Sequence, residues 1–315
     1  MHPKHLLDRY QLEPKKSLGQ NFLHDEGLLG RIVAAAELSP DDDVLEVGPG
    51  LGALTRPLAR AARRVVAVEL DNRLLPVLES ELGGLGNVEL VHGDVLELDP
   101  ADWFAAPYVV VANVPYYITG AILRHLLGGR PRPRRLVLTV QREVAARLTA
   151  RPPEMSLLAV SVQYYGRARL VSAVKAGAFW PRPEVNSAVV RIDVAARHLW
   201  SAGERGGAGV GENAMQGPLP GGERPVSPAP LLPRSPAPSS TDTEEARFFR
   251  VVRAGFSEKR KQLKNNLRQL GLDDAAITAA LEHAGIDGRR RAETLTIAEW
   301  EGLTRALSSS SSARA

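Results

Sequence analysis

Short runs rich in valine, leucine and alanine alternate with helical patterns along the first 195 residues. The runs cover residues 44–47, 65–68, 88–91, 108–111 and 136–140, and a further strand is expected at 187–193. Helical patterns such as 54–62 and 72–82 lie between them. This alternation predicts a parallel sheet with helices on both faces. In such sheets ligands bind beyond the carboxyl ends of the strands, so the chemistry is expected there.

The remainder of the chain differs in composition. Residues 201–243 are mostly Gly, Pro, Ser, Ala and Glu, which cannot bury enough apolar surface to offset the entropy of ordering. We therefore expect a disordered linker over 196–243. Residues 244–270 are predicted to form one long helix and 273–284 another, and Thr296 to Glu299 has the spacing of a capping box that opens a last helix through Leu307. The predicted domains are a catalytic domain over 1–195, a helical domain over 244–308 and a disordered tail over 309–315.

The composition narrows the class of protein. The chain of 315 residues has no cysteine, which excludes disulfides, thiolate metal sites and cysteine nucleophiles. The seven histidines show no metal-ligand spacing, so no metal is expected. The sequence has neither a signal-peptide core nor an apolar run of membrane-spanning length, so we expect a soluble cytoplasmic protein. The formal net charge of +4 favours a polyanionic partner such as nucleic acid.

Glycines and acids follow the first three predicted strands. The loop from Glu46 to Gly52 places Gly48 and Gly50 where a backbone can approach a ligand, with a helix start behind them. Glu69 ends the second strand and could accept both ribose hydroxyls, and Asp94 follows the third and could accept the amino group of an adenine. A helix cap at Asp94 is the plainer alternative. Together these signals predict bound adenosine, and they fit a dinucleotide site equally well.

The fourth strand is followed by Asn113, Val114, Pro115 and Tyr116. An exocyclic adenine amine is a poor nucleophile because its lone pair is delocalised into the ring. The side-chain oxygen of Asn113 and the carbonyl of Val114 can accept its two N–H bonds and free that lone pair. Pro115 fixes the backbone, and Tyr116 offers a face on which a flipped base can stack. This arrangement predicts amine methylation by orientation, without a strong general base.

Six ordered blocks resemble the ribosomal RNA adenine dimethyltransferase family, specifically its small-subunit (16S) enzymes. The blocks are Lys16 to Leu23, Glu46 to Gly52, Asn113 to Tyr116, Gln141 to Leu148, Ala178 to Ser187 and Phe256 to Leu267. The resemblance implies a Rossmann-like α/β sheet that uses S-adenosylmethionine and releases S-adenosylhomocysteine, with a small C-terminal all-α domain. It also implies dimethylation of two adjacent adenines near the 3′ end of 16S rRNA, in a small-subunit (30S) assembly intermediate, by a monomer.

The resemblance also implies site residues. The segment 1–25 is expected to serve cofactor and substrate, and the cofactor contacts implied are Gln20, Asn21, Leu23, Gly48, Gly50, Glu69, Asp94 and Asn113. Tyr116 and Phe179 are expected to sandwich the target adenine. Family members commonly carry a Tyr-Gly-x-Leu-Ser stretch before the strand that corresponds to residues 157–162. Here Pro152 to Ser156 is shorter and lacks it, which leaves the RNA contacts of that loop open.

Basic residues gather in the predicted helix after the linker. Between residues 247 and 268 the chain carries eight Lys and Arg residues and one acid, Glu258, which gives a local charge of +7. A second basic cluster consists of Arg130, Arg132, Arg134 and Arg135. Such stripes neutralise phosphates without reading sequence, so we expect RNA there. The predicted RNA-binding residues are Arg247, Arg250, Arg253, Lys259, Arg260, Lys261, Lys264 and Arg268.

Three alternatives remain at this point. A related methyltransferase of large-subunit rRNA, of the macrolide-resistance type, shares the block around Tyr116. The match around Phe179 and over 291–295 favours the small-subunit enzyme. A non-catalytic ribosome-assembly or transcription factor could use the same scaffold, although intact Asn113 and Tyr116 argue against it. An NAD oxidoreductase fits the glycine loop but not the motif that begins at Asn113.

Overall fold

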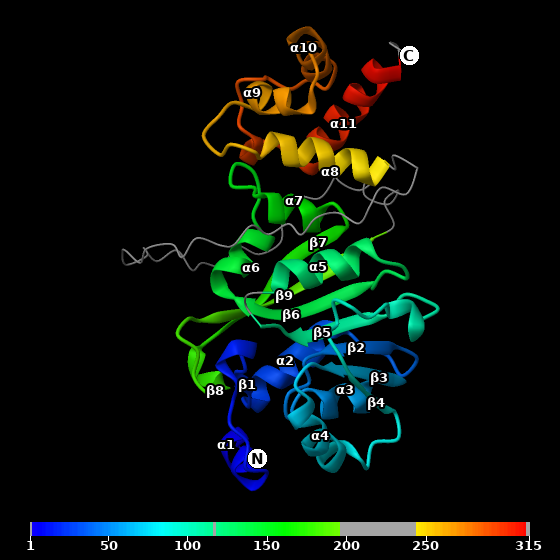
Figure 1. Ribbon diagram of the computed structural model, residues 1–315, viewed down its shortest axis with the longest axis vertical. Coiled ribbons are helices and arrows are strands. Elements are labelled where there is room, and N and C mark those ends of the chain that lie inside the picture. The colour runs from blue at the N-terminus through cyan, green and yellow to red at the C-terminus, as the bar shows by residue number, and fades with distance from the viewer. Residues whose placement is uncertain (1, 116–117, 196–243, 313–315) are drawn as a thin grey trace.

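The computed structural model describes residues 2–115, 118–195 and 244–312, of which 309–312 are described by their backbone alone (Figure 1). A seven-stranded sheet with the order β4-β3-β2-β5-β6-β9-β7 forms its centre. Five neighbouring strands run parallel: β2 (Asp43–Val47), β3 (Arg64–Glu69), β4 (Val88–His92), β5 (Val109–Asn113) and β6 (Arg135–Gln141). All five were predicted. The strand order changes direction at β2, between β3 and β5, which is where ligands bind in sheets of this type.

The predicted parallel pairing holds from β4 to β6, and the other edge of the sheet is antiparallel. Strand β9 (Ser187–Val194), which was predicted, pairs antiparallel with β6 and with β7 (Gly166–Val174). Strand β7 was not predicted. No crossover helix separates β7 from β9, and a parallel pair would require one.

Helices cover both faces of the sheet, as predicted. Alternate residues of each strand point to opposite faces, so Val44 and Val109 join one core and Leu45 and Val110 join the other. On the first face lie α2 (Glu26–Ala36) and α3 (Thr55–Ala61). The second face packs against α5 (Thr119–Gly128), α6 (Arg142–Leu148) and α7 (Leu157–Gln163). Helix α4 (Leu75–Leu82) lies beside β4.

Helix α7 corrects the expectation of a strand over 157–162. Ser156 has extended backbone angles, and its hydroxyl accepts a hydrogen bond from the amide of Ala159 at 3.1 Å. This is an N-cap, and it starts a helix despite the β-branched residues that follow. The side chains of Ala159, Val160 and Val162 are buried against the sheet.

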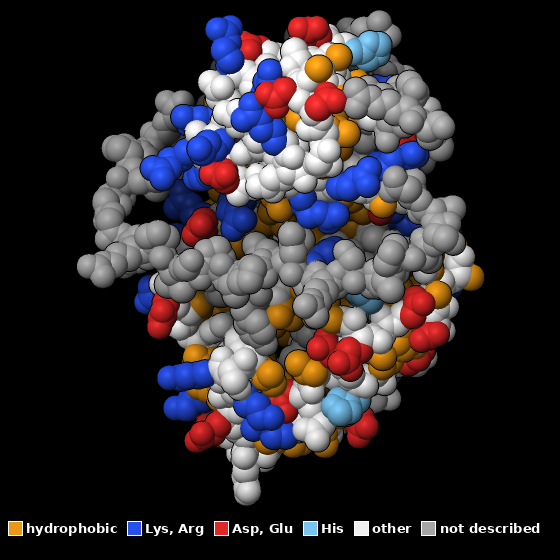
Figure 2. Space-filling view, turned by 45° about the horizontal axis from the view of Figure 1, so that its top comes forward, with side chains coloured by type: hydrophobic (Ala, Val, Ile, Leu, Met, Phe, Trp, Pro, Cys, Tyr) orange, Lys and Arg blue, Asp and Glu red, His pale blue; other side chains and the backbone are white. Residues whose placement is uncertain are grey.

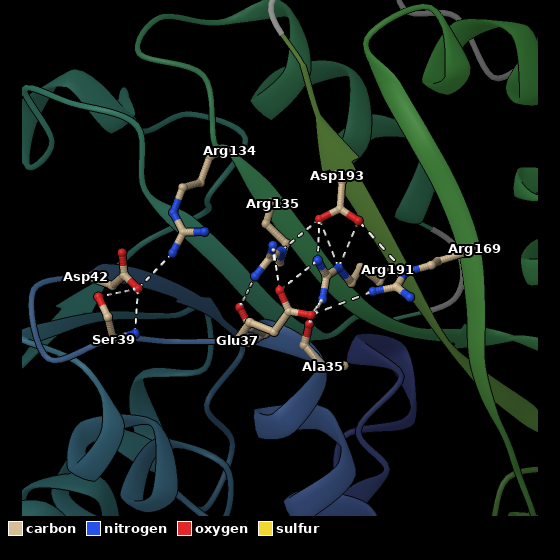
Figure 3. Close-up of polar contacts among 10 residues, drawn as sticks. Ala35, Glu37, Ser39, Asp42, Arg134, Arg135, Arg169, Arg191 and Asp193 are labelled. Carbon is tan, nitrogen blue, oxygen red and sulfur yellow. Dashed lines mark hydrogen bonds and ion pairs between the residues drawn. The ribbon is translucent and has the colours of Figure 1, made fainter. Parts of the chain in front are cut away.

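Figure 3 shows a network of charges that joins α2 to the antiparallel edge of the sheet. Arg191 on β9 is only 5% exposed, pairs with Glu37 and Asp193, and donates to the carbonyl of Ala35 at 2.9 Å. Arg135 at the start of β6 donates to Asp193 at 2.8 Å. Although burial acts to raise it, hydrogen bonds from Arg191 and Arg135 lower the pKa of Asp193. The network lies at the end of β6 opposite the candidate site.

Four helices follow the linker region: α8 (Glu244–Gly255), α9 (Leu263–Leu267), α10 (Asp274–His283) and α11 (Ile297–Ser312). The ring of Phe248 on α8 stacks on Tyr164 after α7, with ring centroids 4.1 Å apart, so these helices share a core with the sheet region (Figure 1). The predicted linker, 196–243, lies outside the described residues.

The expectation of a single helix over 244–270 was wrong, because α8 ends at Gly255. A Cβ atom at Gly255 would lie 2.3 Å from Cη2 of Trp300, so only glycine lets α11 pack so close. The side-chain amide of Asn266 donates to the carbonyls of Gly255 and Glu258 at 2.6 and 3.0 Å. It thus satisfies one carbonyl that the ended helix leaves open and one in the turn that follows.

The predicted capping box is confirmed at the start of α11. The amide of Thr296 donates to the carboxylate of Glu299 at 2.7 Å, and the amide of Glu299 donates back to the Thr296 hydroxyl at 3.2 Å. Helix α11 continues to Ser312, so part of the predicted disordered tail is helical, while 313–315 lie outside the described residues. No helix among the described residues is long and apolar enough to cross a membrane.

The N-terminus folds back against the middle of the chain. After α1 (Pro3–Arg9), β1 (Phe22–Leu23) pairs antiparallel with β8 (Phe179–Trp180), with Leu23 opposite Phe179. This two-stranded sheet was not predicted. It places the segment before β1 over the carboxyl ends of β2 and β5.

Candidate active site

A cavity of about 340 Å³ lies at the carboxyl ends of β2, β3 and β5, where the strand order changes direction. Its walls include every predicted cofactor residue: Gln20, Asn21, Leu23, Gly48, Gly50, Glu69, Asp94 and Asn113. Val114 and Pro115 also line it. Segments from five parts of the sequence therefore meet at one site.

The glycine loop between β2 and α3 needs glycine for its backbone. Gly48 and Gly50 have φ values of 70° and 59°, in the left-handed region. The amide of Gly48 donates to the carbonyl of Val68 at 2.9 Å, which fixes the loop to β3. A Cβ atom at Gly48 would meet nothing within 4 Å, so the loop presents bare backbone to the cavity.

Glu69 at the end of β3 supports this loop. Its carboxylate accepts hydrogen bonds from the amide of Gly50 at 3.1 Å and from the amide of Asp71 at 2.9 Å. The residue is only 6% exposed, and burial raises its pKa. The predicted ribose-binding acid therefore also holds the glycine loop in place.

Glu46, at the foot of the same loop, is buried at 1% exposure and lines the cavity. Burial, helped by the charge of Glu69, raises the pKa of Glu46 to about 8, and the nearby hydroxyl of Thr55 opposes this shift without reaching hydrogen-bond geometry. Among the described residues, nothing donates a hydrogen bond to its Oε2. Sequence analysis placed Glu46 in the loop without assigning it a role. Its raised pKa could not be predicted from the sequence, because it depends on how deeply the fold buries the carboxyl group.

Asn113 at the end of β5 faces the N-terminal segment. Its Nδ2 donates to the backbone carbonyl of Asn21 at 3.0 Å, across 92 residues of sequence. Because the nitrogen is engaged there, Oδ1 is the atom of this amide left to accept a hydrogen bond from a ligand. The next residue, Val114, donates its amide to the carbonyl of Thr139 at 3.2 Å, which ties the motif to β6.

The remaining predicted residues differ in where they lie. Asp94 follows β4, and its Oδ1 caps the amide of Leu96 at 2.9 Å. Tyr116 lies outside the described residues. Phe179 is only 3% exposed and packs in the core with Leu23 and Val189, and it is absent from the walls of the cavity.

The predicted RNA-binding residues are divided between elements by the break after α8. Arg247, Arg250 and Arg253 lie on α8, and Lys259, Arg260 and Lys261 are exposed in the turn before α9. Lys264 is on α9, and Arg268 pairs with Asp274 through two hydrogen bonds of 2.8 and 2.7 Å. Figure 2 shows lysine and arginine side chains gathered on the upper half of the visible face.

The second basic cluster is largely engaged within the protein. Arg132 donates to Glu245 at 2.7 Å, Arg134 pairs with Asp42 at 2.7 Å, and Arg135 belongs to the network of Figure 3. All three side chains pair with acids of the chain itself, and Arg132 joins the loop before β6 to α8. They are therefore less available to phosphates than the predicted cluster implied.

Comparison with known proteins decides the family. A model of the ribosomal RNA adenine dimethylase family matches residues 11–202, which is more than half of the chain. The chain belongs to the ribosomal RNA adenine dimethylase family. The resemblance read from the six sequence blocks is thereby confirmed, and the family excludes an NAD oxidoreductase.

Two relatives carry the name ribosomal RNA small subunit methyltransferase A. The protein of Dehalococcoides mccartyi strain CBDB1 is 40% identical over 95% of this chain and 90% of its own length. That of Geobacillus thermodenitrificans is 41% identical over 96% of this chain and 94% of its own length.

Two solved structures are similar to this chain in fold. The 23S rRNA methyltransferase ErmE is 29% identical, with a TM-score of 0.65 over 91% of this chain and 100% of its own. A dimethyladenosine transferase from Plasmodium falciparum has a TM-score of 0.68 over 90% of this chain and 95% of its own, at 22% identity, which speaks for the fold alone. These matches agree with the predicted methyltransferase sheet and C-terminal helices.

Proposed function

We propose that this chain methylates the N6 amines of two adjacent adenines near the 3′ end of 16S rRNA, with S-adenosylmethionine as methyl donor. One observation carries the proposal: the glycine loop, Glu69 and Asp94 share a single cavity with Asn113 and Val114. The residues proposed to bind the adenosine of the cofactor therefore line the same cavity as Asn113 and Val114, which can accept hydrogen bonds from an amine. The small-subunit name of the full-length relatives supports 16S rRNA as the substrate.

The cavity fits the proposed cofactor. Glycine at 48 leaves open space where a side chain would project, as close approach of a ligand to the loop requires. We propose that Glu69 accepts the ribose hydroxyls, that Asp94 accepts the adenine amine, and that Gln20, Asn21, Leu23 and Gly50 enclose the remainder. Bound S-adenosylmethionine supplies an electrophilic methyl group on its sulfonium.

Asn113 then performs the activation. Its Oδ1 and the carbonyl of Val114 accept the two N–H bonds of the target amine, which turns the nitrogen lone pair toward the methyl group. Pro115 fixes the backbone that presents this carbonyl. The alkylated amine is acidic enough to lose its proton to water, so the catalysis consists mainly of orientation.

Tyr116 and Phe179 are proposed to stack on the target adenine. Because Phe179 is buried in this conformation, stacking requires its ring to be uncovered when the base enters. A substrate-induced movement of β8 against β1 would do this, since Phe179 sits in that pair.

The proposed partner is 16S rRNA in a 30S assembly intermediate, held by the basic residues of α8, α9 and the turn between them. We further propose that the enzyme acts as a monomer, and in the cytoplasm, where that intermediate would be available.

The test is transfer of labelled methyl groups to undermodified 30S and 50S subunits by the purified protein. We expect dimethyladenosine in 16S rRNA of the 30S subunit alone. Transfer only to 50S subunits would identify the large-subunit activity instead. No transfer to a competent 30S precursor would indicate a non-catalytic assembly factor.

Asn113→Ala provides the matched variant. It removes Oδ1 from the amine and is expected to abolish transfer, while thermal unfolding remains within a few degrees of the wild type because Asn113 lies at the end of its strand. Substantial remaining activity would refute the role of Oδ1.

A further inference from the structure

Asp71 lies behind the wall of the cavity, two residues after Glu69. Its side chain is fully buried, yet it is not among the residues that line the cavity. Neither its charge nor its burial is explained by contact with a ligand. The residues that it binds supply the explanation.

The Asp71 carboxylate binds two residues of the N-terminal segment. Lys15 Nζ donates to Oδ1 at 3.2 Å and Gln20 Nε2 donates to Oδ2 at 2.8 Å. The segment is closed on itself, because the amide of Lys15 donates to Oε1 of Gln20 at 2.7 Å. One carboxylate therefore fastens both ends of the turn 15–20 to the end of β3.

Arg73 completes the surroundings of this carboxylate. Its Nε and Nη2 donate to Oδ1 and Oδ2 of Asp71 at 2.9 and 2.7 Å. Hydrogen bonds from Arg73, Gln20 and Lys15 hold the pKa of Asp71 well below its usual value, against the opposing effect of burial. The carboxylate thus stays charged, and able to accept these hydrogen bonds, at neutral pH and well below it.

The fastened turn leads directly to the catalytic amide. Gly19, with φ of 61°, turns the chain, and Asn21 Nδ2 donates to its carbonyl at 3.1 Å. The carbonyl of Asn21 receives Nδ2 of Asn113 at 3.0 Å. One hydrogen bond joins Asp71 to Gln20, and another joins Asn21 to Asn113. Because residues 20 and 21 are neighbours in the chain, Asp71 is connected through this segment to the group that we propose activates the amine.

We propose that Asp71 is a positioning residue that fastens the segment 15–23 over the cofactor and thereby sets the orientation of the Asn113 amide. The inference rests on the proposed function for the identity of cofactor and substrate. Asp71 touches neither of them and acts through Gln20 and Asn21. It also holds Glu69 through its backbone amide, so one residue supports both walls of the cavity.

The test compares Asp71→Asn with Asp43→Asn. Asp43 at the start of β2 also accepts two hydrogen bonds from an arginine, Arg63, at 3.0 and 2.8 Å, but it lies at the opposite end of the strands. In Asp71→Asn the new side-chain NH2 group would face the hydrogen-bond donors of Gln20 or Arg73 in place of an acceptor oxygen. At least one of these hydrogen bonds would be lost, so the segment loosens. A hydrogen bond to a charged group is worth enough to change an equilibrium constant about tenfold.

We expect Asp71→Asn to bind S-adenosylmethionine and S-adenosylhomocysteine about tenfold more weakly in calorimetric titration, and to lower kcat on 30S subunits severalfold. Hydrogen exchange of the amides at 20–23, measured without cofactor, should accelerate in this variant. Asp43→Asn should match the wild type in all three measurements. Lys15→Met, which removes only one contact on a half-exposed side chain, should show a smaller change of the same kind.

Unchanged affinity and exchange in Asp71→Asn would overturn the inference, even if its melting temperature falls, because that pattern marks a purely structural residue. If Asp71→Asn does not fold, Lys15→Met and Gln20→Leu test the inference instead. Wild-type cofactor affinity and wild-type hydrogen exchange in both variants would overturn the inference. Failure of the wild type to methylate would instead refute the proposed function, while binding and exchange still test the fastening of the segment.

Discussion

The side-chain amide of Asn113 has two different partners to satisfy. Its nitrogen donates to the carbonyl of Asn21, and its oxygen is proposed to accept from the substrate amine. Asn113→Asp keeps an acceptor for the amine but places a second oxygen against the Asn21 carbonyl. We expect transfer to fall at least a hundredfold in this variant, measured as kcat on 30S subunits. Activity within threefold of the wild type would contradict the two-partner role.

Glu46 makes stability depend on pH. Its pKa is about 8 in the folded protein and near 4.5 when the chain is unfolded. The folded state therefore binds more protons between these two pH values. The contribution of Glu46 to the free energy of unfolding is full below pH 4.5 and is lost as the pH rises through 8. Glu46→Gln removes this dependence. We expect its melting temperature to exceed that of the wild type by several degrees at pH 8, with little difference at pH 5.

Melting temperatures across pH 5–9 check this prediction for Glu46. Glu97→Gln, at an exposed position, serves as the control and should leave the pH dependence as it is in the wild type. A Glu46→Gln curve parallel to that of the wild type would show that Glu46 does not carry a raised pKa.

Residues that line the cavity could be named from the sequence, because strand ends and glycine loops are local signals. Gly48, Glu69 and Asp94 were named from the positions at which their strands stop. Asp71 and the contact between Asn21 and Asn113 could not be found this way. They join residues 51 to 92 positions apart, and nothing local distinguishes Asp71 from any acid that begins a helical turn.

The contact between α8 and α11 depends on Gly255. In Gly255→Ala the new methyl group would lie 2.3 Å from the Trp300 ring, so the helices must separate. We expect a loss of about 1–3 kcal/mol in the free energy of unfolding. Gly302→Ala on α11 is the control, because its methyl group meets nothing within 4 Å and favours the helix. Equal stability of the two variants in denaturant unfolding would contradict the packing argument.

Arg191 joins α2 to β9 in the network of Figure 3. Arg191→Met keeps an unbranched apolar stem but leaves Asp193 and the carbonyl of Ala35 without this donor. We expect a loss of about 2–4 kcal/mol in unfolding free energy at pH 7. The deficit should shrink on acidification, since the lowered pKa of Asp193 stabilises the wild type only where this carboxylate is charged.

Arg63→Met removes a comparable but exposed ion pair and should cost under about 1 kcal/mol. Denaturant titrations at pH 7 and pH 4 separate the two variants. A similar loss for both at pH 7 would show that the network contributes no more than a surface pair.

At the level of elements, the pattern of apolar residues identified strands most clearly where the strands are buried. β2, β3, β5 and β6 are mostly apolar and were found. β7 was missed because Arg167, Arg169 and Ser172 interrupt its apolar residues, and most of its side chains are exposed or half-buried. β4, at the other edge of the sheet, was found because Val88, Leu90 and Val91 make most of it apolar. The single helix expected over 244–270 failed for another reason: the chain breaks where Gly255 meets Trp300, a contact between residues 45 positions apart that no window of sequence can contain.

Across the whole molecule, the basic surface should govern RNA affinity. Lys259, Arg260 and Lys261 are exposed, and replacing all three by Gln removes up to three phosphate contacts. We expect the slope of log affinity against log salt to fall by about 2–3 in magnitude, with S-adenosylmethionine binding unchanged. Arg63→Gln, at the far end of the sheet, should not alter the slope. Filter binding to 16S rRNA fragments at 50–300 mM salt measures both, and an unaltered slope in the triple variant would exclude this turn from the RNA interface.

The pairing of β1 with β8 has a consequence for the order in which the molecule is made. Trp180 and Phe179 leave the ribosome more than 150 residues after Phe22 and Leu23, against which they align. The segment that covers the cavity is thus synthesised long before its partner strand and cannot be put in place until that strand follows. A nascent chain cannot close its own active site until nearly the whole catalytic region has emerged.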